Sequence, residues 1–175
     1  MFKEIPLSDN VVVLSIGSNL GNKLENIEKV YLKLKEKLKI AELFCSPLII
    51  TESWGYDSEN SFLNCAAAFE TNIKNPEELL GITQNIEHEI GRTAKTSNRV
   101  YCDRLIDIDI VFFGSRKYQS SNLEIPHIKM KERSFVLVPI SLLKAPFFSI
   151  DFKKYIHELI TNCPDDSSFE MFTPI

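Results

Sequence analysis

The stretch Asp103-Arg-Leu-Ile-Asp-Ile-Asp-Ile-Val-Phe-Phe-Gly114 carries two carboxylates inside a run of apolar and largely β-branched residues. Such a run is typical of a β-strand. Asp107 and Asp109 are two positions apart, so a strand would place both carboxylates on one face, with their Cα atoms about 7 Å apart. The stretch therefore predicts a strand that presents a pair of acids side by side.

The acid pair, Asp107 and Asp109, has two interpretations. It could hold one or two Mg²⁺ ions, because magnesium binds carboxylate oxygens at about 2.0–2.1 Å and takes water and substrate phosphates as its other ligands. The alternative is a polar strand face in contact with solvent. Leu105, Val111 and Phe113 share the parity of the aspartates, so we expect this face to be partly buried rather than simply wet.

The composition fits one domain. The chain has 175 residues, of which 44% are hydrophobic and 25% charged, and this is enough for one substantial core. Apolar runs stay below the roughly 18 residues that span a membrane, and charges near the amino terminus argue against a signal peptide. We therefore expect a cytoplasmic protein with no membrane partner. No C-x-x-C spacing links the four cysteines, which are interpreted as ordinary thiols.

The arginines are unevenly distributed. A net charge of −4 argues against a nucleic-acid partner, which would need a basic surface. All five arginines nevertheless fall in the segment around the acid pair: Arg92, Arg99, Arg104, Arg116 and Arg133. Guanidinium groups bind phosphate oxygens in bidentate fashion, so the cluster predicts a polyphosphate site, with chance clustering as the alternative.

Predicted strands and helices alternate along the chain without a repeat. Strands are expected at 11–16 and 62–71, with extended chain at 44–51. A helix begins after Asn22, which can cap it together with Glu25. Asn64 is a polar residue in an otherwise apolar strand. It either satisfies a nearby backbone group or forms hydrogen bonds to a planar heterocycle.

A second helix has complete end signals. These are Asn75 as N-cap, Pro76 in the first turn, Glu78 in the capping-box position and Gly91 after the last turn. Its apolar stripe consists of Leu79, Thr83, Ile86 and Ile90. Gln84 and Glu87 share an adjacent face, where they meet either a nucleotide or solvent. The polar segment that follows, up to Arg104, is predicted to be a mobile loop that closes over bound phosphates.

Several motifs together resemble one enzyme family, 6-hydroxymethyl-7,8-dihydropterin pyrophosphokinase. They are Ile16-Gly-Ser-Asn-Leu20, Phe62-Leu-Asn64, Gln84-Asn-Ile-Glu87, Gly91-Arg92, Arg104-Leu-Ile-Asp-Ile-Asp-Ile110, and Ile125-Pro-His127 with Arg133 and Phe135. The resemblance runs from about residue 11 to residue 143. It implies an α+β, ferredoxin-like fold with an antiparallel sheet and helices packed on it. It also implies transfer of pyrophosphate from ATP to the pterin hydroxymethyl group, with release of AMP.

The resemblance also implies roles for individual residues. Asp107 and Asp109 would bind two Mg²⁺ ions that bridge the ATP phosphates. Arg92 and Arg104 would complete the catalytic set. Either aspartate of the pair could accept the proton of the pterin hydroxyl. The ATP pocket would contain Gln84, Glu87, Arg92, Arg99, Arg104, Ile110, His127 and Arg133. The pterin pocket would contain Thr51, Phe62, Asn64, Tyr101 and Phe135, with aromatic rings enclosing the bicycle and Asn64 at its polar edge.

The chain departs from the family pattern around the predicted loop. Many members have a second arginine where Ala94 stands, and Lys95 or Arg99 is expected to supply that charge. Tyr101 occupies a place often held by tryptophan. Ile128 follows His127 where tyrosine is common. These differences affect the loop and leave the metal and pterin residues of the pattern intact.

We assign residues 1–162 to a pyrophosphokinase domain and 163–175 to a tail or the start of a linker, because the tail shows little sign of order. Relatives of this family can be fused to other folate-pathway enzymes, so such a neighbour is a possible partner. Two rival functions stay open. One is a magnesium-dependent nucleotidyltransferase that uses the same acid pair. The other is a noncatalytic RNA-binding module on a ferredoxin-like fold, although the [KR]-G-[FY]-[GA]-F signature is absent.

Overall fold

The computed structural model describes residues 5–91 and 102–173. In chain order the elements are β1 (Val11–Ser18), α1 (Lys23–Leu38), β2 (Phe44–Cys45), β3 (Ile49–Thr51), β4 (Phe62–Glu70), α2 (Pro76–Ile90), β5 (Asp107–Phe113), β6 (Tyr118–Gln119), β7 (Glu124–Ile125), the 3₁₀ helix Met130–Glu132, α3 (Ser134–Leu142), α4 (Ile150–Thr161) and β8 (Phe169–Met171). None of the helices in these ranges is both long and apolar enough to cross a bilayer.

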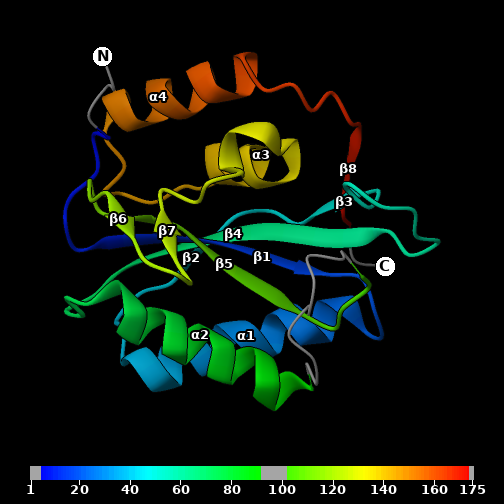
Figure 1. Cartoon of the computed structure of the whole chain (residues 1–175), viewed down its shortest axis with the longest axis horizontal. Helices are drawn as coiled ribbons and strands as arrows, with labels where there is room; N and C mark the ends of the chain where they lie inside the picture. The colour runs from blue at the N-terminus through cyan, green and yellow to red at the C-terminus, as the bar shows by residue number, and fades with distance from the viewer. Residues whose placement is uncertain (1–4, 92–101, 174–175) are drawn as a thin grey trace.

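The central sheet has the strand order β5-β1-β4-β3-β8, and all of these neighbours are antiparallel. Up to Phe113, and leaving the short β2 aside, the chain follows the order strand, helix, two strands, helix, strand. In the sheet, β5 and β3 take the two edge positions of that unit. This is the ferredoxin-like arrangement, so the predicted α+β fold class is confirmed. Figure 1 shows α1 and α2 on one face of the sheet, and α3 and α4 on the other.

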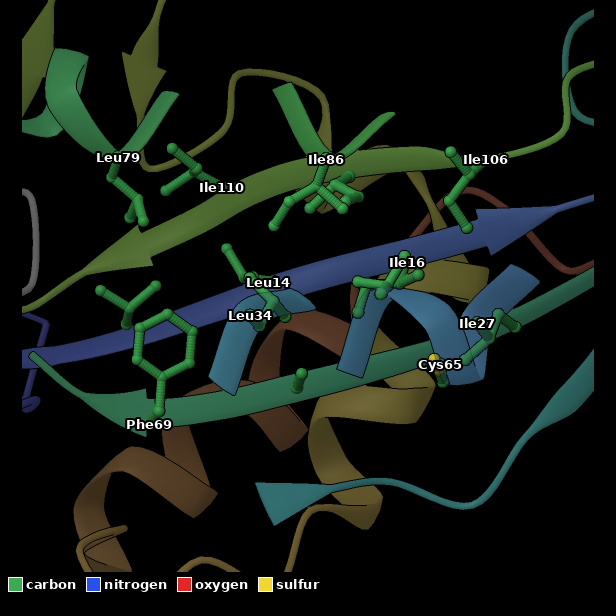
Figure 2. Packing of buried hydrophobic residues seen from close by; sticks show 14 of the residues in the cluster. Leu14, Ile16, Ile27, Leu34, Cys65, Phe69, Leu79, Ile86, Ile106 and Ile110 are labelled. Carbon is green, nitrogen blue, oxygen red and sulfur yellow. The ribbon is translucent and has the colours of Figure 1, made fainter. Parts of the chain in front are cut away.

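The sheet separates two apolar cores because side chains alternate between its faces. Every residue of β1 is buried, as expected for a central strand covered on both sides. Leu14 and Ile16 pack toward α1 and α2 with residues such as Ile27 and Ile86, and Figure 2 shows this cluster. Val13 belongs to the opposite cluster, under α3 and α4. The sheet is therefore the middle layer of a three-layer structure, with helices on both sides.

The helix ends follow the sequence signals closely. The side chain of Asn22 accepts a hydrogen bond from the Glu25 amide, and Gly91 ends α2 in a left-handed conformation. Asn75 caps α2 as predicted, but its side chain accepts from the Glu77 amide. The Glu78 amide bonds instead to the Asn75 carbonyl. The N-cap is thus confirmed, while the capping-box geometry expected between Asn75 and Glu78 is not formed.

A bulge in β5 corrects one prediction about the acid face. Val13 pairs with Phe112, whereas the next residue, Leu14, pairs with Ile110, so Val111 is the extra residue. Val111 does share the face of the aspartates and packs in the core under α3 and α4. Phe113 lies in the other core, against α1 and α2, because the bulge reverses the alternation. The prediction that Phe113 shares the face of the two acids was therefore wrong.

The far edge of the sheet also differs from expectation. The extended segment 44–51 is split into β2 and β3, since Ser46 and Pro47 interrupt the regular ladder. The tail after Cys163 was expected to show little order, and this is wrong for Phe169–Met171, which pairs with β3 as β8. The side chain of Asp165 anchors the same tail: it accepts hydrogen bonds from the amide and hydroxyl of Ser134, each at 2.8 Å.

Asp165 is predicted to stabilise the fold by capping α3 from a distance, because the N-cap residue Arg133 makes no side-chain capping bond. Asp165→Ala should lower the free energy of unfolding at pH 7 by about 1 kcal/mol in urea titrations. Hydrogen bonds from Ser167 and Ser134 hold the pKa of Asp165 below its ordinary value, although desolvation opposes them. The folded state then binds fewer protons than the unfolded state. The difference between wild type and variant should therefore shrink as the pH falls below about 3.9.

Asp166→Ala is the matched control, since Asp166 is an exposed neighbour of the same chemistry. Equal destabilisation by both variants, or a difference that grows in acid, would contradict the capping role.

Candidate active site

The floor of the site is a row of polar and small residues across neighbouring strands. In the sheet register, Asp109 lies opposite Ser15, and Asp107 lies opposite Gly17. Gly17 in turn lies opposite Asn64 on β4. Directly opposed residues in a sheet project to the same face, so the two carboxylates and the Asn64 amide stand on one surface with the glycine between them.

Gly17 gives the floor its shape. A Cβ atom at this position would lie 2.7 Å from Oδ1 of Asn64 and 3.6 Å from the ring of Phe62. Glycine thus allows the Asn64 amide to lean over β1. The amide nitrogen of Asn64 donates a hydrogen bond of 2.8 Å to the hydroxyl of Thr51 on β3. This bond orients a buried amide whose carbonyl oxygen faces the glycine.

Basic groups surround the two carboxylates. Arg104 Nη1 lies 2.8 Å from Oδ2 of Asp107. On the other acid, Oδ2 of Asp109 lies 3.7 Å from Arg133 Nη1 and 3.9 Å from His127 Nε2. His127 is positioned by its backbone amide, which donates to the Val111 carbonyl of β5 at 3.1 Å. The acid pair is thus the centre of a compact group of opposite charges.

The two acids are not equivalent. Desolvation and the nearby charge of Asp107 raise the pKa of Asp109, against the opposing effect of His127, Arg133 and Arg104. A raised carboxyl pKa means that negative charge is costly at this position. The site can lower this cost by taking up a cation or a proton. Carboxylates with shifted pKa in a cleft are frequent at functional sites.

An aromatic wall stands beside the charged group. The rings of Trp54 and Phe135 have centroids 6.4 Å apart and are tilted by 57°. The Arg133 guanidinium lies 4.9 Å from the Trp54 centroid and 5.6 Å from that of Phe135. Cation–π contacts of this kind fix the orientation of rings and guanidinium together. Arg133 therefore connects the aromatic wall to Asp109.

One cavity of about 270 Å³ joins these features. It brings together nine of the residues that the sequence resemblance assigned to the site: Thr51, Phe62, Asn64, Arg104, Asp107, Asp109, His127, Arg133 and Phe135. Among the described residues, no group of three or more His, Cys, Asp or Glu side chains could hold a metal. A cation at the acid pair would therefore take its remaining ligands from water and from the substrate.

Three residues expected in the ATP pocket do not line this cavity. Ile110 is buried in the core toward α1 and α2. Glu87, expected at a nucleotide or in solvent, is only 8% exposed, and its Oε1 accepts a hydrogen bond of 2.7 Å from the Ile108 amide of β5. Gln84 lies one turn earlier on the same helix and is half-buried. Of these residues, Glu87 contacts the outer edge of β5 through the Ile108 amide.

The arginine cluster forms only in part. Arg104 and Arg133 line the cavity, but Arg116 lies near the opposite end of β5, where its side chain donates to the Lys74 carbonyl and its guanidinium stacks on Phe113. Including Arg116 in a polyphosphate site was therefore wrong. The predictions for the loop residues Arg92, Ala94, Lys95, Arg99 and Tyr101 lie outside the described residues.

The structure adds lining residues that sequence reasoning missed. They are Ser15, Gly17, Glu52, Trp54 and Tyr56. Ser15 and Gly17 could have been found only with the pairing of β1 to β5 known. Trp54 did offer a signal, because it is the chain's one tryptophan and stands in a polar loop beside a glycine.

Comparison with known proteins gives a consistent result. The family model described as 7,8-dihydro-6-hydroxymethylpterin-pyrophosphokinase (HPPK) matches residues 13–145. A 2-amino-4-hydroxy-6-hydroxymethyldihydropteridine pyrophosphokinase of Porphyromonas gingivalis is 42% identical over 132 residues, which are 75% of this chain and 88% of that protein. A folate synthesis bifunctional protein of Arabidopsis thaliana is 38% identical over 129 residues, 74% of this chain and 26% of the relative.

Solved structures agree on the fold. The chain superimposes on the crystal structure of wild-type Plasmodium falciparum HPPK-DHPS with pteroate with a TM-score of 0.61 and 15% identity, covering 87% of this chain and 44% of that one. At this identity the likeness concerns the fold alone. The family match and the sequence identities carry the assignment: this chain belongs to the 7,8-dihydro-6-hydroxymethylpterin-pyrophosphokinase family.

Proposed function

We propose that this chain, as a pyrophosphokinase of folate biosynthesis, transfers pyrophosphate from ATP to the hydroxymethyl group of 6-hydroxymethyl-7,8-dihydropterin and releases AMP. The observation that supports this function best is the cavity, in which a pair of carboxylates lies beside an amide and an aromatic wall. The acids suit polyphosphate chemistry, while the amide and rings suit a flat heterocycle. One cavity thus offers places for the pterin and for the ATP phosphates.

The pterin half of the cavity lies over Asn64. Its amide can donate and accept hydrogen bonds in one plane, which matches the polar edge of a pterin. Phe62 and Phe135 also line the cavity and supply rings against which a bicycle can stack. Because Thr51 already holds the Asn64 amide, little ordering is left to occur when the substrate binds.

The ATP phosphates are assigned to the acid pair. The fit to magnesium is good: Asp107 and Asp109 are two hard oxygen donors side by side on one face, and both line the cavity. Two Mg²⁺ ions held by Asp107 and Asp109 would supply the positive charge that stabilises the transferring phosphates. Arg104, Arg133 and His127 surround the acids and can orient the phosphate oxygens by charge-assisted hydrogen bonds.

The reaction itself is a displacement in line. The pterin hydroxyl oxygen forms a bond to the β-phosphorus of ATP, and the bond from that phosphorus to the oxygen bridging the α- and β-phosphates breaks, so AMP leaves. We assign the hydroxyl proton to one carboxylate of the pair.

The adenine half is proposed to lie along the outer edge of β5. The Ile108 amide points to this edge, where Glu87 accepts its hydrogen bond, and the Val111 carbonyl on the same edge accepts from His127. Alternate residues of a strand direct their amides to the same side, so the Ile110 amide points there as well. Backbone groups of Ile110 and the side chain of Gln84 would then contact the base.

The proposed reaction predicts the identity of the products. Wild-type protein with ATP, Mg²⁺ and 6-hydroxymethyl-7,8-dihydropterin should release one AMP for each pterin diphosphate formed, because the attack is at the β-phosphorus. Chromatography of the nucleotides with and without the pterin measures this. Inorganic pyrophosphate as the product would indicate a nucleotidyltransferase instead, and AMP release that does not need pterin would reject the proposed acceptor.

The acid pair is predicted to be essential. Asp107→Ala and Asp109→Ala should each lower pterin-dependent AMP release by at least about a hundredfold, since each removes a magnesium ligand at the transferring phosphate. Asp151→Ala, an exposed aspartate on α4, serves as the control for loss of a negative charge. Wild-type turnover in both acid variants, measured at saturating Mg²⁺, would eliminate the metal site.

Gly17 is predicted to control the pterin half of the cavity. Gly17→Ala places a methyl group 2.7 Å from Oδ1 of Asn64 and so displaces the amide from its position beside Thr51. The KM for the pterin should rise about tenfold while the KM for ATP stays nearly constant. Gly81→Ala on α2, where an added Cβ meets no atom within 4 Å, is the matched control. Parallel changes in both KM values would show that the amide is not specific to the pterin.

A further inference from the structure

The carboxylate of Asp103 lies where two separate segments meet. Its Oδ1 accepts hydrogen bonds from Asn19 Nδ2 at 2.7 Å, from the Ser58 hydroxyl at 2.7 Å and from the Tyr56 hydroxyl at 3.0 Å. Its Oδ2 accepts from Asn60 Nδ2 at 2.6 Å. Three of the four donors belong to the segment between β3 and β4, and the fourth follows β1. One side chain thus joins a connecting loop to the end of the central strand.

These donors keep Asp103 ionised. The hydrogen bonds from Ser58 and Asn60 are the largest causes that lower the pKa of Asp103 to about 2, and Asn19 and Tyr56 act in the same direction. An ionised carboxylate only accepts hydrogen bonds, and it accepts them more strongly than a neutral group. All four partners are donors. The arrangement is therefore complementary to a carboxylate.

The tethered segment is a wall of the cavity. Residues 52–61 connect β3 to β4 without helix or strand, and Glu52, Trp54 and Tyr56 from this segment line the cavity. An irregular segment of this length has many conformations, and ordering it when a ligand binds would weaken the affinity. The Ser53 hydroxyl adds an internal bond to the Tyr56 carbonyl at 2.6 Å. Asp103 adds bonds from outside the segment, beside the bond that Lys23 Nζ donates to the Ser61 carbonyl at 2.9 Å and the contact of Trp54 with Phe135.

Asn19, one of the donors to Asp103, is itself bound to the backbone of Arg104, just before β5. Oδ1 of Asn19 accepts a hydrogen bond of 2.7 Å from the Arg104 amide, and the Asn19 amide donates to the Arg104 carbonyl at 3.2 Å. The side chain of Arg104 pairs with Asp107. Asp103 therefore holds the loop against a part of the backbone that is already fixed relative to the acid pair. The loop position is set relative to the reacting groups.

We propose that Asp103 is a positioning residue for the pterin pocket: its carboxylate pins residues 52–61 so that Trp54 and Tyr56 form a preorganised wall for the ring substrate. This inference rests on the proposed function, which places the pterin beside Phe135, the ring next to Trp54. The phosphate half of the site holds its charged residues on β5, on the segment 127–133 and at Arg104, which Asn19 and Asp107 hold independently of the loop. Loss of the anchor should consequently affect the pterin and spare ATP.

Kinetics of position 103 variants test the substrate dependence. Asp103→Ala should raise the KM for the pterin about tenfold, with kcat and the KM for ATP changed by less than about twofold. Asp103→Asn can keep an acceptor at the Oδ1 position but turns its amide toward Asn60, so its effect should be intermediate. Ser58→Ala removes one donor to Asp103 and also the acceptor of the Asn60 amide. It should raise the KM less in the Asp103→Ala background than in the wild type, because the bond between the two side chains is already lost there. Asp57→Ala, an exposed aspartate in the same loop, is the control and should behave as wild type.

Trp54 provides a second readout that needs no substrate. As the one tryptophan of the chain, it reports on the loop alone. In Asp103→Ala, acrylamide should quench its fluorescence more strongly and its anisotropy should fall, while the circular dichroism of the fold is retained. A wild-type pterin KM in this variant, or an equal rise in both KM values, would overturn the inference. If the wild type turns over no pterin, the proposed function fails as well, and unchanged Trp54 fluorescence in the variant would then reject the anchor separately.

Discussion

The register of β1 between β4 and β5 is the constraint on which both the fold and the site depend. Because the strand is buried on both faces, a shift by one residue would move Leu14 and Ile16 out of their core and reverse every contact of the strand. The same register sets Gly17 between Asp107 and Asn64. Packing of the apolar residues on one face thus fixes the distance between the acid pair and the amide on the other face.

The two faces of the sheet have different tasks. The face under α1 and α2 is packed with aliphatic residues and supplies rigidity (Figure 2). The other face is closed by α3 and α4 over only part of its area, and the cavity occupies the end of the sheet where Asp107 and Asn64 lie. The bulge at Val111 lies near the boundary between these regions and lets β5 pack densely beyond the acids. Stability and chemistry are therefore separated along one strand as well as across the sheet.

The sequence predicted what short-range patterns determine. The strand character of β5, the caps at Asn22 and Asn75 and the common face of the two acids follow from residues a few positions apart, and the structure agrees. Features that depend on distant pairing were not predictable in the same way. Phe113 lies on the face opposite to the one expected because β5 is bulged at Val111 in its pairing with β1. β8 is exposed at all three positions and forms through backbone pairing with β3, so its place at the sheet edge does not depend on burial of its side chains.

The acids in and near the site have different roles, and the sequence around each acid does not distinguish these roles. Glu87 and Asp103 are both acids near the site. Glu87 accepts a hydrogen bond from a backbone amide of β5, and Asp103 accepts hydrogen bonds from side chains of a loop. Each carboxylate has its donors within the protein. Asp109 differs, because desolvation and Asp107 raise its pKa despite three basic neighbours. The ionised form of such a carboxyl group is unfavourable in the protein alone, and a bound cation can stabilise it. Sequence spacing predicted the acid pair, but only the surroundings distinguish it from the carboxylates whose hydrogen-bond donors all lie within the protein.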